Sequence, residues 1–352
     1  MMTMFQLTTR ILLPTVVFLA LAVAAIQYLF IEGIIEGRID SKLDAICDQP
    51  LDSASSPLRI AYTGFSEPDK RFCGIAVIYH SIMTPFYRPF LLEFLAGAGA
   101  TLLVPFVEAA RDKHSSLFGL PGITFGMLGQ FGGMGLATPV YALLFVTSGA
   151  AARKPGPGAK INQGNAEALL FGLIVGWIIP TACLAFLEDP TVTILWQIFP
   201  IVMEVLQVAH RIVRPPSRLT ESGYYTVQAA YATVLVASAA LHIHYIWPLL
   251  SDQDTLSQLF LPSLGPIDRA TAPLLDGLLD FLKWDFGIGI VSAFVLNLWF
   301  ADNLFSCVVL IIWCIATTVV LGPAAAICSV LMWREEKLNG PNQATKVDKK
   351  EN

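Results

Sequence analysis

The chain has 352 residues, of which 55% are hydrophobic and 14% are charged, and its formal net charge is −5. Soluble globular proteins carry nearer a quarter charged residues, so the composition excludes an ordinary soluble enzyme. The high hydrophobicity excludes a disordered chain, and 22 Lys and Arg against 27 Asp and Glu leave no basic excess for binding nucleic acid.

Apolar runs of membrane-spanning length follow one another along the chain. A spanning helix needs about 20 mostly apolar residues, and it must be helical because lipid offers backbone amides no hydrogen-bond partner. The sequence therefore predicts an all-α polytopic membrane bundle of about eight transmembrane helices, forming one domain over residues 1–335. The predicted spans are 11–31, 90–110, 117–147, 167–187, 191–212, 224–249, 284–301 and 304–333. The first has a longer apolar core than a signal peptide, so we interpret it as a retained anchor.

The segments between the spans are more polar. We expect residues 36–89 to form a polar loop followed by an interfacial or re-entrant segment, and residues 152–160 to form a turn-rich loop. Residues 251–283 have apolar positions at helical spacing, which predicts a helix lying on the membrane surface. The end of the chain, 336–352, predicts a disordered polar tail. Cys47 and Cys73 bracket the long loop, and both a disulfide and two free thiols are compatible with the sequence.

The charges give conflicting indications of orientation. Basic loops at 153–160 and 211–218 favour the cytosol, yet eight spans would place the tail on the opposite side. The chain ends Lys349-Lys350-Glu351-Asn352, which is similar to the dilysine retrieval signal of endoplasmic-reticulum membrane proteins, a signal read from the cytosol. We give the tail more weight, and it predicts an integral protein of that membrane.

Carboxyl groups near or inside the spans are candidates for proton chemistry, because ionisable groups are costly in lipid. Burial of Glu93 would keep it protonated, the form that donates a proton to an alkene or epoxide; a carboxylate reaching the interface is the alternative. One helical face combines Gln197, Glu204, Gln207 and Arg211, which suits a proton site or a polar packing seam. Glu108, followed by charged residues, is expected to be solvated.

Asp285 and Asp302 bracket the seventh predicted span. Helix capping is the simpler interpretation of both, although Asp302 also has aromatic neighbours that suit an acid. His242 and His244 are two residues apart and face different sides of a helix, so they make a poor metal site. Packing competes with a catalytic role for His242.

Aromatic residues and glycines complete the pattern. Most rings fit the aromatic belt at the membrane interfaces, but a cavity walled by rings would also stabilise a carbocation. The pairs Gly122/Gly126 and Gly129/Gly133 predict close helix packing. Gln130 and Thr138 would then project into any cavity that the glycines leave open.

Several motifs are absent from the sequence. It has no GxxxxGK[ST] or GxGxxG nucleotide motif, no DxxxD pair inside a span, no HExxH and no GxSxG. A nucleotide-driven machine, a prenyltransferase that holds magnesium diphosphate and a metalloprotease are therefore disfavoured. No internal repeat is evident, which weakens a transporter built from two similar halves.

The layout resembles the fungal membrane-bound terpene cyclases of meroterpenoid pathways, the group that includes the ascofuranone and macrophorin cyclases. The resemblance rests on the length, the multi-span plan, the long polar loop and the runs ITFGMLGQFGGMGLATPVY (123–141) and MEVLQVAHRIVRPP (203–216). It implies a fungal secondary-metabolism enzyme of the intramolecular lyase or isomerase type. Such an enzyme protonates the terminal alkene or epoxide of a prenylated, farnesyl-like precursor without metal or other cofactor. A prenyltransferase and an epoxidase would supply that precursor.

The site assignments come from the residues themselves. We expect Glu93, Glu204 or Asp302 to donate the proton, with Gln130, Gln197 and His242 orienting it or accepting the final proton. The candidate cation walls that would bind the substrate are Trp196, Tyr231 and Trp299. A non-repeat membrane transporter of a secondary metabolite is the main alternative, and a structural membrane partner is a third.

Overall fold

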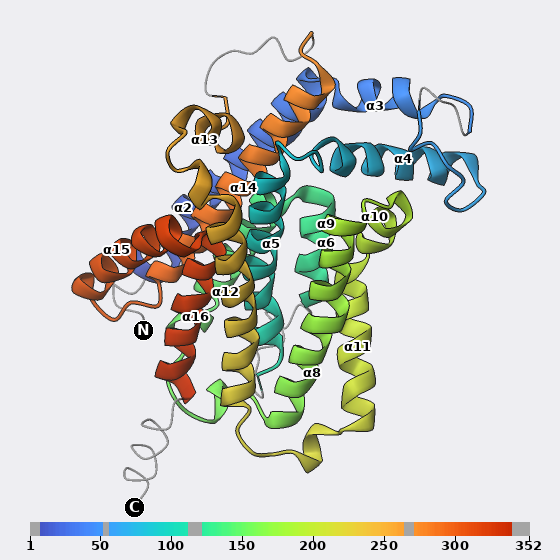
Figure 1. Cartoon of the computed structure of the whole chain (residues 1–352). Coiled ribbons are helices and arrows are strands. Elements are labelled where there is room, and N and C mark those ends of the chain that lie inside the picture. Colours follow the sequence, from blue (N-terminus) through green and yellow to red (C-terminus); the bar gives the residue numbers. More distant parts are fainter. Residues whose placement is uncertain (1–7, 52–55, 112–121, 264–270, 340–352) are drawn as a thin grey trace, which may run out of the picture.

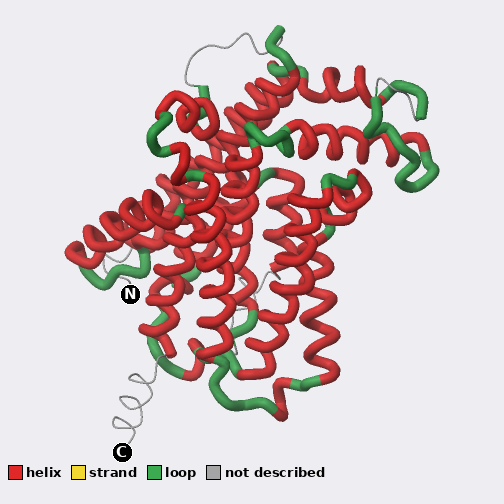
Figure 2. Tube along the Cα trace, in the orientation of Figure 1, coloured by secondary structure: helices red, strands yellow, loops and turns green. Residues whose placement is uncertain are grey.

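The regular structure of the chain is helical. The computed structural model describes residues 8–51, 56–111, 122–263 and 271–339, and within these ranges the strand-type pairing is limited to an isolated bridge between Asn162 and Ser222 (Figure 2). The predicted all-α fold is confirmed. The main helices are α2 (Leu13–Ala25) within the helical segment Thr8–Glu36, α3 (Ile39–Cys47), α4 (Ser66–Ser81), α5 (Arg88–Ala109), α6 (Gly122–Gly132), α7 (Met134–Thr147), α8 (Gln163–Leu173), α9 (Ile179–Leu187), α10 (Pro190–Trp196), α11 (Phe199–Val213), α12 (Tyr224–Tyr245), α13 (Gln253–Phe260), α14 (Leu274–Leu298), α15 (Leu304–Leu321) and α16 (Pro323–Asn339).

Five helical segments of the described chain are long and apolar enough to cross a bilayer. They are Thr8–Glu36, Arg88–Ala109, Gln163–Leu187, Tyr224–Leu249 and Leu304–Leu321. The pair α10 and α11, bent by 61°, would make a sixth. Figure 1 shows α5, α8, α11, α12 and α16 running together along the molecule, with α3 and α4 as an arm across one end. The predicted number of eight spans is not reproduced, because three predicted spans have a different local structure.

The predicted span 117–147 contains a helical hairpin in its described part. Helix α6 ends at Gly132, and Gly133 has a φ of +79°, a left-handed value that glycine adopts without steric cost. The first residue of α6, Gly122, lies against Phe106 near the C-terminal end of α5. Ala150, just after α7, lies at the same end of the bundle, where its carbonyl accepts a hydrogen bond from Arg334. The chain thus enters the bundle along α6, turns at Gly133 and returns along α7.

The other two differences have local causes. The predicted span 304–333 is two helices, α15 and α16, separated by Gly322 with a φ of +91° and followed by Pro323. The predicted surface helix and the span 284–301 join in one helix, α14, while α13 is a separate short helix. Polar groups on the first half of α14 are satisfied by the α13 segment: Asp280 accepts the Ser263 N–H at 2.7 Å, and Lys283 donates to the Gln258 carbonyl.

The predicted polar loop 36–89 is largely an arm of two helices. One face of α3, with Ile39, Leu43 and Cys47, packs on α4 and on Leu278 of α14. Cys47 and Cys73 form a disulfide between α3 and α4, with their Cα atoms 5.8 Å apart. Of the two alternatives that the sequence left open, a disulfide or two free thiols, the structure contains the disulfide.

A buried charged cluster fills the opposite end of the bundle. Glu108 accepts hydrogen bonds from Arg111 and Arg334, 2.8 and 2.7 Å away, and pairs with Arg153 at 3.4 Å. Arg111 also pairs with Glu335 of α16 at 2.7 Å. The prediction that Glu108 is a solvated residue is wrong, because α16 and the loop after α7 cover it. This set of Glu108, Arg111, Arg153, Arg334 and Glu335 is called the charged cluster below.

The end of α16 lies beside the first basic loop. The Asn339 amide donates to the Ala159 carbonyl at 2.9 Å, so the loop 150–160 and the C-terminal end of α16 share one end of the molecule. The α6–α7 hairpin returns the chain to the end where it started, so the loop 150–160 and the end of α16 need not lie on opposite sides, as eight spans would require. Helix α16 extends past residue 336, where the tail was expected to begin, and residues 340–352 lie outside the described residues.

Candidate functional site

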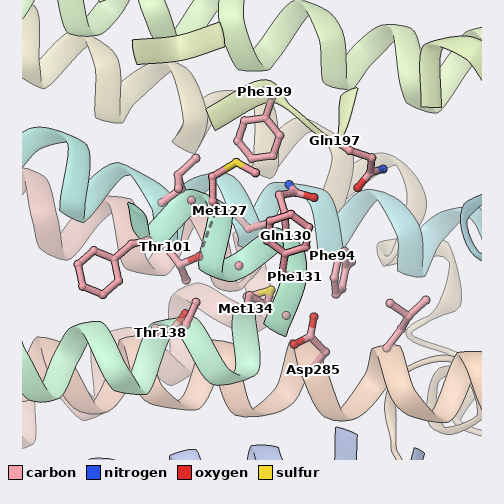
Figure 3. A pocket seen from close by; sticks show the side chains of 18 of the residues that line it. Phe94, Thr101, Met127, Gln130, Phe131, Met134, Thr138, Gln197, Phe199 and Asp285 are labelled. Atoms are coloured by element: carbon pink, nitrogen blue, oxygen red, sulfur yellow. Dashed lines mark hydrogen bonds between the residues drawn. The ribbon is translucent and has the colours of Figure 1, made fainter. Parts of the chain in front are cut away.

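A cavity of about 450 Å³ lies between α4, α5, the α6–α7 hairpin, the α10–α11 pair and α14 (Figure 3). Its wall is mainly apolar, and pockets of this size and character hold small organic ligands. The aromatic residues of the wall are Phe72, Tyr79, Phe94, Phe125, Phe131, Tyr141, Trp196, Phe199 and Phe281. The site is therefore shaped for a hydrocarbon-rich molecule.

Asp285 is the one carboxylic acid among the residues that line this cavity in the described chain. It is 2% exposed, and its Oδ1 accepts the Gly135 N–H at 2.7 Å. No lysine, arginine or histidine of the described ranges forms a salt bridge with it. Figure 3 shows the carboxyl pointing from α14 toward the side where Phe131 and Gln130 lie.

The tip of the α6–α7 hairpin positions this acid. Asp285 lies in the middle of α14, so the prediction that it caps the helix that it precedes is wrong; its carboxylate instead accepts a backbone N–H in the first turn of α7. Gly133 and Gly135 both lie against the carboxyl, and a Cβ added at Gly133 would overlap with Oδ1. The hairpin therefore fixes one oxygen of Asp285 and depends on glycine to do so.

Polar side chains are few in the wall, and two of them have no hydrogen-bond partner among the described residues. Gln130 and Thr138 line the cavity, as expected, and neither forms a hydrogen bond within the part of the chain that the structure describes. Gln197 donates its amide to the Thr193 carbonyl at 3.1 Å and lies within hydrogen-bonding reach of Tyr79. A polar side chain such as the Gln130 amide in an apolar wall is a group that orients a ligand.

The rings beside Gln197 form a fixed stack. Trp196 lies 5.6 Å from Tyr79 and 4.9 Å from Phe199, measured between ring centroids. The Trp196 indole donates to the Thr181 hydroxyl at 2.9 Å, which holds its orientation. Electron-rich ring faces attract a cation by about 2 kcal/mol or more when water is excluded.

Three of the nine predicted site residues line the cavity, namely Gln130, Gln197 and Trp196. Glu93 and His242 are brought together instead: Oε1 lies 2.7 Å from Nδ1, and both side chains are buried between α5 and α12. Neither is part of the cavity wall.

The four remaining candidates lie elsewhere. Glu204 pairs with Arg211 at 3.2 Å, partly exposed. Asp302 is on the surface beside Lys337, and the capping residue of α15 is Asn303, so the capping interpretation of Asp302 is wrong. Tyr231 is buried near the charged cluster, and the Trp299 indole donates to the Thr9 carbonyl at 3.0 Å.

No group of three or more His, Cys, Asp or Glu in the described ranges is arranged to hold a metal ion. Cys314 and Cys328 are buried and have free thiols.

The chain resembles known proteins over most of its length. Residues 10–338 match the CtvD domain. A protein named terpene cyclase ascI from Acremonium egyptiacum is 26% identical over 209 residues, which cover 54% of each chain, so the match spans about half of that relative. Terpene cyclase janA from Penicillium janthinellum is 25% identical over 312 residues, 84% of this chain and 83% of that protein.

A third relative has a different name. It is the FAD-dependent monooxygenase verC1 from Penicillium polonicum, 28% identical over 252 residues, which cover 66% of this chain and 30% of that protein. No solved structure matches the chain.

Proposed function

The chain belongs to the family defined by the CtvD domain, and on this premise we propose that it is a membrane-bound terpene cyclase of secondary metabolism. Its substrate would be a prenylated, farnesyl-like molecule whose terminal alkene or epoxide is protonated. The names of two relatives support the reaction class. The observation that carries the proposal is the acid Asp285 in the wall of an apolar, aromatic cavity.

In this mechanism Asp285 donates its proton to the substrate. Protonation of an epoxide oxygen breaks its C–O bond, and protonation of an alkene carbon uses its π bond; either leaves a tertiary cation. Internal alkenes attack that cation and close the rings. A final proton loss returns the proton count to its start, so the product is an isomer of the substrate. The apolar wall favours the neutral acid that this step requires.

The rest of the wall has two roles. The stack of Tyr79, Trp196 and Phe199 would stabilise the migrating cation through ring faces, and Gln130 and Gln197 would orient the substrate. We assign Glu93 and His242 to the packing of α5 against α12, since Glu93 Oε1 and His242 Nδ1 face one another at 2.7 Å. Initiation by Asp285 needs no metal, so added EDTA should leave the activity unchanged.

The direct test uses microsomes that contain the protein. Incubation with a farnesyl-substituted phenol or its terminal epoxide should yield cyclic products of unchanged mass, identified by mass spectrometry and NMR. Substrate flux across sealed vesicles without any chemical change would overturn the cyclase and establish the transporter.

Gly133→Ala tests the geometry of the acid. The new Cβ would overlap with Oδ1 of Asp285, and the backbone at this position disfavours any side chain. A displacement of about 1 Å at a reacting group costs about 100-fold. We therefore expect kcat to fall about 10- to 100-fold with little change in KM, measured in the microsomal assay.

Gly149→Ala is the matched control. Gly149 also has a positive φ, +82°, but nothing lies within 4 Å of the added Cβ. The Gly149→Ala variant should carry a similar backbone strain from the positive φ and should keep its cyclisation activity. Equal losses in both variants would show that strain, and not the position of Asp285, limits the rate.

We further propose that the protein resides in the endoplasmic-reticulum membrane with the α3–α4 arm in the lumen. The disulfide of the arm suits an oxidising compartment. The basic loops 153–160 and 211–218 at the opposite end suit the cytosol.

Engineered glycosylation measures this orientation. The natural sequence has no Asn-x-Ser/Thr site, but Ala61→Asn creates one before Tyr62 and Thr63, and Arg218→Asn creates one before Leu219 and Thr220. We expect an endoglycosidase-sensitive mass shift for Ala61→Asn and none for Arg218→Asn. The reverse pattern would invert the proposed topology.

Partner enzymes follow from the chemistry of the substrate. A prenyltransferase must attach the chain, and an oxygenase must make the epoxide where an epoxide is used. The similarity between this chain and part of a protein named an FAD-dependent monooxygenase supports such an oxygenase as a neighbour in the pathway.

A further inference from the structure

The cavity has two chemically different ends. Its lining residues on α5 run from Phe94 to Pro105, which at about 1.5 Å per residue corresponds to a length of about 16 Å. Tyr79, Gln197 and Asp285 lie toward the end covered by α4, and the other end is formed largely by Val104, Pro105 and Leu296. In Figure 3, Gln197 and Asp285 lie on one side and Thr101 and Thr138 on the other.

The cavity also has an apolar opening. Two of its lining residues are strongly exposed, Phe131 at 81% and Ile198 at 45%. Both stand at helix breaks, Phe131 next to the turn between α6 and α7 and Ile198 between α10 and α11. In a helix bundle embedded in a bilayer, exposed apolar side chains face lipid, so these two residues mark the place where a ligand dissolved in the bilayer would enter.

From these features we propose that Gln130 and Gln197 form a subsite for the polar head group of the substrate, next to the acid, while the prenyl chain fills the apolar end and bends back toward Asp285. This inference rests on the proposed function. An amide offers both a donor and an acceptor, so the pair suits a phenol hydroxyl or a carbonyl. Gln130 has no partner among the described residues, so its amide is available to the ligand.

The arrangement agrees with how an amphiphile lies in a bilayer. The cavity end with the two glutamines lies under α4, whose exposed Glu67 and Arg71 make this a polar end of the bundle. A prenylated phenol keeps its head near the bilayer surface and its chain in the hydrocarbon. It can therefore enter through the opening without inverting, and its head group meets Gln130 and Gln197 first.

The test compares two ligands that differ by one hydroxyl, 3-farnesylphenol and farnesylbenzene. Binding of each tritium-labelled ligand is measured at equilibrium to purified protein carrying Asp285→Asn, which prevents turnover. Loss of one hydrogen bond should lower the affinity for the phenol about tenfold in Gln130→Met and in Gln197→Met. The affinity for farnesylbenzene should stay within about twofold, which also shows that the cavity is intact.

Thr138→Val is the comparison variant, because Thr138 lies farther along the cavity and forms no hydrogen bond with another described residue. The proposal is overturned if Thr138→Val, and not the glutamine variants, removes the preference for the phenol. It is also overturned if the glutamine variants lose affinity for both ligands equally, or if the Asp285→Asn protein binds both ligands with the same affinity. Cyclisation is measured separately in the unaltered chain, so a head-group subsite without cyclase activity would refute the proposed function and keep the subsite.

Discussion

Asp285→Asn is expected to lower kcat/KM of cyclisation by about 100- to 10,000-fold, the usual contribution of a general acid. The amide keeps an oxygen that can accept the Gly135 N–H, the hydrogen bond that Oδ1 makes at 2.7 Å. The hairpin tip should therefore keep its position while the transferable proton is lost. The measurement is the rate of product formation in microsomes at equal protein content, with folding checked by the thermal unfolding temperature.

Asp276→Asn is the control on the same helix. Asp276 is exposed in the first turn of α14 and does not line the cavity, so this variant should stay within about twofold of the unaltered rate. Glu204→Gln and Asp302→Asn put two of the three acids expected from the sequence, all but Glu93, to the same assay. A full rate in Asp285→Asn, or a larger loss in either of those two, would remove Asp285 from the proposed role.

Much of the helical framework could be predicted from the apolar runs, because hydrocarbon forces a long apolar segment into a helix whatever its neighbours are. The positions of α5, α8–α9 and α12 follow from this argument alone. Turns inside an apolar run could not be predicted in the same way. A run such as 117–147 has the same composition whether it crosses once or turns back, and the deciding feature is the backbone conformation of Gly133.

The candidate site was predicted in part. Gln130, Gln197 and Trp196 are polar or aromatic residues inside apolar runs, and that pattern indicates a cavity wall. The acid of that wall was assigned a capping role because Asp285 stands near the start of a predicted span. Its contact comes from Gly135, 150 residues away in the sequence. The signal that could have found it is the charged pattern on α14, since Asp280, Lys283 and Asp285 lie within two turns and cannot all reach the interface.

Long-range pairing also explains why Glu108 is buried although its sequence neighbours indicate solvent. Its neighbours in sequence are charged and indicate solvent, but Arg334 and Arg153 come from α16 and from the loop after α7. The charged cluster joins three segments that are far apart in the chain. Its contribution to the free energy of unfolding therefore depends on the folded bundle. A substitution in the charged cluster measures how much these ion pairs stabilise the packing of α16.

Arg111→Met is expected to lower the free energy of unfolding by about 3–5 kcal/mol, because it leaves Glu335 buried without its main cation. Arg111 is 1% exposed and pairs with both Glu108 and Glu335. The free energy is measured by SDS titration in mixed micelles with helicity as the readout. Arg211→Met is the control, since its pair with Glu204 is about one-third exposed and such pairs contribute at most about 1 kcal/mol.

A double variant separates lost charge pairing from lost packing. Glu335→Gln removes the carboxylate that Arg111→Met leaves uncompensated, so the double variant should recover part of the stability lost by the single one. Glu108 retains Arg334 and Arg153 in both proteins, at 2.7 and 3.4 Å, so it does not become a second unpaired charge. If the double variant is as unstable as the sum of both single variants, the cost arises from the cavity left by the guanidinium. The charged cluster would then hold α16 by packing and not by its ion pairs.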